Sequence, residues 1–134
     1  MKYFLMTALI STFLSDICFA ANHFWFGKLL TSSQSEARWG KEEFNIERFK
    51  KGDPSERAKM SASLVKNKKL WVGKKIKEIR EQFGSHDGFY FTDWIPAYLI
   101  QVGRSQKEET WQVVFLPDNE YNVKDIVIHK NCCD

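Results

Sequence analysis

Residues 70–84 read LWVGKKIKEIREQFG, and this stretch decides the fold of the chain. Charged side chains fill six positions between 74 and 81, and apolar side chains recur at helical spacing at Ile76, Ile79 and Phe83. This pattern is typical of a short amphipathic helix. Gly73 marks the start of the helix, and Gly84 follows it where a left-handed C-cap residue is expected. We therefore expect structural roles for both glycines.

A second helix is predicted just before this stretch. Asp53 can accept hydrogen bonds from free backbone amides, Pro54 suits a first helical position, and Glu56 completes a capping-box pattern. The helix should run from Pro54 to about Asn67, with its apolar side at Met60 and Leu64. Arg57 falls close to that apolar side, where a guanidinium needs a carboxylate or carbonyl partner. We expect Arg57, like the cap residue Asp53, to have a structural role, and binding through Arg57 is the weaker alternative.

After Gly84 the pattern changes to that of β-strands. Three segments alternate apolar and polar residues, at 97–103, 110–116 and 123–129. Their short connections favour an antiparallel meander. One face would carry Tyr98, Ile100, Val102, Trp111, Val113, Phe115, Ile126 and Ile128. We predict an α+β fold class in which two N-terminal helices pack on a three-stranded antiparallel meander sheet, as a two-layer sandwich.

The chain begins with the features of a secretory signal peptide. Lys2 precedes an apolar run, and Cys18-Phe19-Ala20 places small residues at a cleavage site. We predict cleavage near Ala20, so that the mature protein is periplasmic or secreted. A transmembrane anchor is the weaker alternative, because the run is shorter than the roughly 20 apolar residues that a bilayer requires. Lipidation at Cys18 is a further alternative, although the residues before it fit a lipoprotein signal poorly.

The predicted organisation has three parts: a signal peptide at 1–20, an aromatic and polar N-terminal segment at 21–43, and a single α+β domain at 44–134. A total of 134 residues suits one domain. The N-terminal segment includes Trp25 between two phenylalanines, which could form a strand or cover the core, and then a polar, turn-like linker at 31–35. At the start of the domain, Phe44 and Phe49 should turn inward on a short helical turn.

Several of these residues together resemble a known family. The pattern contains Leu70-x-x-Gly73, then Ile76-x-x-Ile79-x-x-x-Phe83-Gly84, and then strands at 98–103 and 111–115. It resembles the small periplasmic proteins of the SmpA/OmlA (BamE-like) family, which includes a lipoprotein subunit of the outer-membrane β-barrel assembly machine. The architecture is also shared with each half of the β-lactamase inhibitor protein. The chain differs in that its residues before Cys18 fit a lipoprotein signal poorly and in having Ser85 where a proline usually follows Gly84, so the resemblance implies a divergent member that shares the scaffold.

No pattern in the sequence predicts catalysis, a cofactor or a metal site. The three histidines lack the spacing of metal ligands: His23, His86 and His129. His86 and Asp87 could form half of a catalytic dyad, but no nucleophile motif accompanies them. The adjacent cysteines Cys132 and Cys133 could form a vicinal disulfide, bridge to another chain or remain an unpaired tail.

Charge and aromatic content indicate binding. The formal net charge is +3 at pH 7, and nucleic acid is not expected as the partner of an exported chain. The six lysines between 66 and 77 are either a solvated hinge, which the pattern alone favours, or a cationic edge with Lys68, Lys69 and Trp71 as contacts. Such an edge suits an anionic membrane surface or an acidic protein. So small a core cannot easily bury five tryptophans with the other aromatic residues, so we expect exposed binding aromatics at Trp25, Phe89, Tyr90 and Trp94.

The function that these observations favour is a non-enzymatic protein-binding or scaffold module of the cell envelope, with an envelope protein as its partner. The alternative is a secreted or periplasmic inhibitor or immunity protein, which would block the active site of an enzyme with an aromatic loop. A small enzyme that depends on His86 or Asp87 ranks third.

Overall fold

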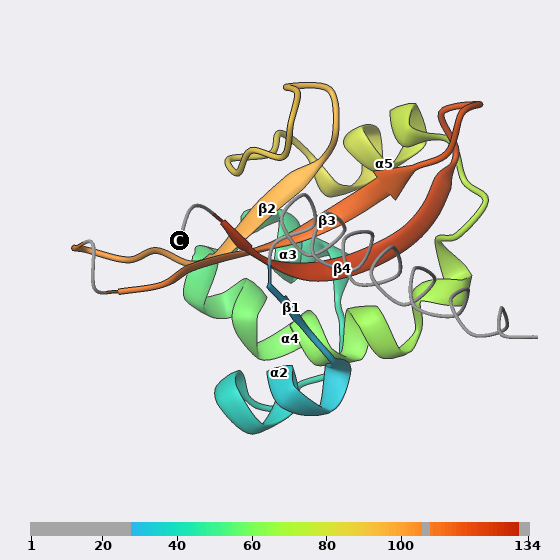
Figure 1. The fold of residues 1–134 in the computed structure, drawn as a ribbon. Coiled ribbons are helices and arrows are strands. Elements are labelled where there is room, and N and C mark those ends of the chain that lie inside the picture. Colours follow the sequence, from blue (N-terminus) through green and yellow to red (C-terminus); the bar gives the residue numbers. More distant parts are fainter. Residues whose placement is uncertain (1–27, 106–107, 132–134) are drawn as a thin grey trace, which may run out of the picture.

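The computed structural model describes residues 28–105 and 108–131. These residues form an α+β fold with four α-helices, a 3-10 turn and one antiparallel sheet (Figure 1). In chain order the elements are β1 (Leu29–Leu30), α2 (Ser32–Trp39), α3 (Ile46–Lys51), α4 (Pro54–Lys66), η1 (Lys68–Leu70), α5 (Ile76–Phe83), β2 (Ala97–Gln101), β3 (Thr110–Pro117) and β4 (Val123–Asn131). The α+β class is therefore confirmed.

The sheet has the strand order β1-β4-β3-β2, and all of its neighbouring strands are antiparallel. The predicted meander is present as β2, β3 and β4, but the prediction of only three strands is wrong, because β1 pairs with the outer edge of β4. The first strand also ends at Gln101, before Val102, which is exposed rather than on the core face. A two-residue strand such as β1 has no periodicity of its own, so only its pairing defines it.

One face of the sheet packs on α3, α4 and α5 and forms the main core. Tyr98, Trp111 and Phe115 of the sheet are each no more than 1% exposed. Tyr98 meets Phe49 of α3 with ring centroids 5.5 Å apart, and Phe115 meets Phe83 of α5 with ring centroids 4.8 Å apart. Edge-to-face pairs of this kind add to the free energy gained from burial. The predicted inward position of Phe49 is confirmed, and Phe44 is half-buried against the same core.

The helix α2 lies where the sequence predicted a turn-like linker at 31–35, so that prediction is wrong. The Thr31 side chain accepts a hydrogen bond from the Gln34 backbone amide, and the Gln34 side chain accepts one from the Thr31 amide. This reciprocal pair is a capping box. The hydroxyl groups of Ser35 in α2 and Ser61 in α4 are 2.6 Å apart and fully buried, so α2 packs closely on α4 (Figure 1). The predicted fold class counted two helices, so α2 is additional, whereas α3 corresponds to the short helical turn that was predicted with Phe44 and Phe49.

The predicted ends of the two helices are largely confirmed. Asp53 accepts a hydrogen bond from the Glu56 amide as the N-cap of α4, although the Glu56 carboxylate pairs with Arg48 instead of completing a capping box. Gly84 follows α5 with φ +83° and ψ −169°, a conformation open to glycine but different from the left-handed cap that we predicted. Gly73 also has a positive φ, but α5 begins only at Ile76.

Arg57 has the structural role that the sequence predicted. Its side chain is 10% exposed and forms an ion pair of 2.8 Å with Asp87, which lies in the connection between α5 and β2. The Arg57 guanidinium also donates to the carbonyl oxygens of Phe49 and Leu99. Asp87 accepts a hydrogen bond from the Leu99 amide of β2. This pair therefore joins α3, α4, the connection and the sheet.

The opposite face of the sheet, here called the outer face, is covered by residues 88–95. A second and smaller core forms there from Tyr90, Ile95, Ala97 and Val114. Trp94 packs against both cores. The connection between α5 and β2 therefore does more than join two elements, because it forms the cover of the outer face.

Candidate functional site

The segment 88–95, which we call the aromatic loop, presents two phenylalanines to solvent. Phe89 is 52% exposed and Phe91 is 54% exposed, whereas Tyr90 between them is 7% exposed. Tyr90 packs edge-on against His129 of β4, with ring centroids 5.0 Å apart. Of the binding residues predicted here, Phe89 thus lies at the surface, Trp94 is half-buried and Tyr90 belongs to the second core.

Gln112 of β3 holds the backbone of the aromatic loop on the outer face. Its side-chain oxygen accepts a hydrogen bond of 3.0 Å from the Phe89 amide, and its side-chain nitrogen donates one of 2.7 Å to the Phe89 carbonyl. Gln112 is fully buried, where a polar group needs such partners. The backbone of Phe89 is thereby fixed although its ring is exposed.

A tight turn positions Phe91. The Thr92 amide donates to the Tyr90 carbonyl oxygen over 2.6 Å, and Phe91 between them has φ +57°. A hydrogen bond across three residues with positive φ at the centre defines a γ-turn of the rarer, strained kind. Such strain persists only where the surrounding structure enforces it, and it is found preferentially at functional sites. Here the buried Tyr90 and the clamped Phe89 enforce it.

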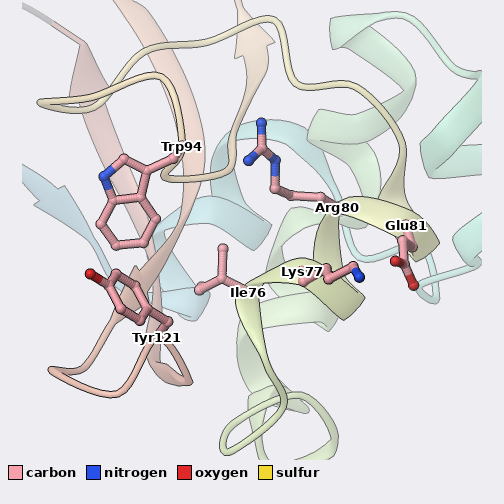
Figure 2. A pocket seen from close by; sticks show the side chains of 6 residues that line it. All are labelled: Ile76, Lys77, Arg80, Glu81, Trp94 and Tyr121. Atoms are coloured by element: carbon pink, nitrogen blue, oxygen red, sulfur yellow. The ribbon is translucent and has the colours of Figure 1, made fainter.

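An open pocket of about 410 Å³ lies where the aromatic loop, α5 and the β3–β4 turn meet. Its lining consists of Ile76, Lys77, Arg80, Glu81, Trp94 and Tyr121 (Figure 2). The rings of Trp94 and Tyr121 meet edge-on, with centroids 5.1 Å apart. Tyr121 is 62% exposed and, like Phe91, has a positive φ. The pocket thus combines an aromatic wall with charged side chains of α5.

The lysine-rich segment offers different residues from those predicted. Lys68 forms an ion pair of 2.7 Å with Asp125 of β4, whereas Lys69 is exposed. Trp71 is half-buried, with its ring centroid 4.9 Å from that of Phe83. The exposed apolar side chains of this segment are instead Leu70, at 68%, and Val72, at 40%. Trp71 between them therefore contributes to the core more than to the surface.

The candidate catalytic pair His86 and Asp87 is taken up by structural contacts. Asp87 serves Arg57 and the Leu99 amide, and the His86 ring packs edge-on against Tyr98 at 6.3 Å. Burial raises the pKa of the Tyr98 hydroxyl, which donates to the Gly84 carbonyl oxygen. Within 28–105 and 108–131, no three His, Cys, Asp or Glu side chains gather as metal ligands would. These contacts give Asp87 and His86 places in the fold.

Three predicted residues lie outside the described part of the chain: Trp25, Cys132 and Cys133. Sequence reasoning missed two others that shape the site: Gln112 and Tyr121. The available signal for Gln112 was a polar amide inside an otherwise apolar strand, where burial demands a partner.

Comparisons with family models, curated proteins and solved structures found no match for this chain. Among the helices that the structure describes, none is both long and apolar enough to cross a membrane.

Proposed function

We propose that this protein is a non-enzymatic protein-binding module of the cell envelope, which contacts an envelope protein through the aromatic loop. The observation that carries the proposal is the pair of exposed rings, Phe89 and Phe91, on a backbone that Gln112 and Tyr90 hold in place. The predicted signal peptide and the resemblance to the SmpA/OmlA family support the location and a scaffold role.

Fixed aromatic rings suit protein binding for two physical reasons. Each ring removes a large apolar area from water when it enters a pocket of a partner, and a Phe or Tyr side chain loses little conformational freedom. Since the loop backbone is already held by hydrogen bonds and burial, little further ordering is needed on binding, which improves affinity. The two rings are therefore expected to dominate the binding energy.

Site-specific cross-linking tests the proposal. A photo-reactive phenylalanine analogue is placed at Phe91, and at the exposed Glu43 between α2 and α3 as the matched control. Illumination in intact cells should give a discrete adduct from position 91 and none from position 43. Equal adducts from both positions would argue against the loop as the binding surface.

The partner identified by mass spectrometry is then purified and titrated. The Phe91→Ser change should weaken its affinity at least tenfold, which corresponds to about 1.4 kcal/mol and to a hot-spot residue. Unchanged affinity for both Phe91→Ser and Phe89→Ser would refute the proposal. Cell fractionation and N-terminal mass spectrometry test the location, with a mature chain beginning near Ala21 as the expected result.

The inhibitor function remains the second candidate because one observation favours it. Phe91 lies at the centre of a strained turn, and a preformed projecting ring is suited to entering an active-site cleft. A one-to-one complex with a hydrolase, and loss of that enzyme's activity, would favour this function over a scaffold role.

A further inference from the structure

We propose that the pocket between Trp94, Tyr121 and α5 is a second binding site, for a short acidic peptide segment that carries an apolar side chain. This inference goes beyond the proposed function, because the aromatic loop can bind a partner whether or not the pocket is occupied. It depends on three observations: the shape of the pocket, its unpaired cations and its aromatic wall.

The pocket has separate apolar and cationic sides. Trp94 and Tyr121 lie together at one side, while Lys77 and Arg80 extend from α5 (Figure 2). The buried Ile76 adds a third apolar side chain to the lining. An apolar side chain placed against the two rings would therefore lie within reach of positively charged groups.

The cations of the pocket have no anionic partner in the described chain. The ion pairs within 28–105 and 108–131 involve neither Lys77 nor Arg80, although other exposed cations, such as Arg38 and Lys68, are paired. Residues 74–83 carry four cationic and two anionic side chains. This excess charge favours an acidic ligand over a basic or a neutral one.

Arg80 is suited to recognise a carboxylate. A guanidinium donates two parallel hydrogen bonds to a carboxylate, whereas Lys77 offers a less directional charge. Glu81 also lines the pocket and would repel a second carboxylate placed beside it. The pocket therefore favours one acidic group next to an apolar side chain. That carboxylate could belong to Asp, to Glu or to the C-terminus of a chain.

Peptide titration tests the inference on the full mature chain labelled with ¹⁵N. The probe is the acetylated and amidated hexapeptide Gly-Gly-Leu-Phe-Asp-Gly, and its matched control has Asn in place of the single Asp. The acidic peptide should shift the indole N–H signal of Trp94 and the side-chain N–H signal of Arg80. The Asn peptide should bind at least tenfold more weakly. A free-acid tetrapeptide Gly-Asn-Leu-Phe distinguishes a terminal carboxylate from a side-chain carboxylate.

Three variants locate the binding. Arg80→Gln should weaken binding at least tenfold, and Tyr121→Asn should do so as well, because Asn tolerates the positive φ but lacks the ring. Lys41→Gln removes an exposed cation elsewhere and should leave binding unchanged. Phe91→Ser should also leave it unchanged, which separates this test from that of the aromatic loop.

The inference is overturned if the Asp and Asn peptides bind alike, or if Arg80→Gln binds like the unmodified chain. It is also overturned if vesicles of phosphatidylcholine with phosphatidylglycerol shift the pocket signals while no peptide does. The pocket would then serve a membrane surface and not a peptide.

Discussion

Replacing Asp87 by Ala should destabilise the fold by about 2–3 kcal/mol. The change leaves the Arg57 guanidinium, whose side chain is 10% exposed, with only the carbonyl oxygens of Phe49 and Leu99 as partners. Removing one member of a buried ion pair costs about 3–5 kcal/mol. The cost expected for Asp87→Ala is below this range because the Asp87 side chain is 42% exposed and solvent already screens part of the interaction.

The reverse change should be milder. Arg57→Leu keeps an apolar stem against Phe49 and Tyr98, and the half-exposed Asp87 carboxylate can then turn to water. The double variant Arg57→Leu with Asp87→Ala should therefore be more stable than Asp87→Ala alone, because no buried charge is left unpaired.

Urea unfolding followed by tryptophan fluorescence measures these differences, provided the m-values agree. The Asp87→Ala variant should lose about 10–20 °C in Tm, by the scaling for domains of this size. Arg48→Gln, which removes two exposed ion pairs, with Glu42 and with Glu56, is the matched control and should change stability much less. A loss below about 1 kcal/mol for Asp87→Ala, or a double variant less stable than that single variant, would refute the reasoning.

Three further predictions concern the aromatic loop and the acid stability of the fold. Gln112→Leu leaves the partly buried backbone amide and carbonyl of Phe89 without their partner and should cost about 2 kcal/mol in urea unfolding, with Gln112→Glu retaining part of the stability. Phe91→Gly should be more stable than Phe91→Ala by about 1 kcal/mol, because only glycine adopts φ +57° without strain, and equal stabilities would mean that the turn is unstrained. Hydrogen bonds from the Trp111 indole and Arg38 lower the pKa of Glu109 below its usual 4.5. The stability that the ionised Glu109 adds to the fold is therefore complete above pH 4.5 and is lost as the pH falls through the lowered pKa. Glu109→Gln should accordingly flatten the fall of Tm between about pH 5 and 3, and an unchanged slope would contradict this assignment.

The sequence predicted the elements whose signals are local. The cap at Asp53-Pro54 placed α4, and alternation in β3 and β4 placed the core face, because side chains of a strand point to opposite sides. The helix α2 was not predicted because it has no stripe of apolar residues at helical spacing. Its buried residue is Ser35, whose hydroxyl group forms a hydrogen bond with that of Ser61. The Thr31–Gln34 capping box was the one local signal for it.

The candidate site was predicted only in part, because exposure depends on tertiary contacts. The sequence indicated that 89–94 contains binding aromatics, but three aromatic residues in a row look alike until their partners are known. Tyr90 is buried in the second core, where its ring packs against His129 of β4, and the Gln112 side chain forms a hydrogen bond with the backbone of Phe89. Neither partner is close in sequence to the loop. The Trp94–Tyr121 pocket likewise requires three separate segments of the chain to meet.

The outer edge of β2 has a consequence for how copies of this protein behave at high concentration. The Ala97 carbonyl accepts from the Gly88 amide, and the Leu99 amide and carbonyl bond to Asp87 and Arg57. A strand from another molecule would find these backbone groups already occupied, and unoccupied edges are what permit sheets to join between molecules. Sequence changes at Asp87 or Gly88 would therefore endanger solubility as well as stability, because they would free the backbone groups of this edge.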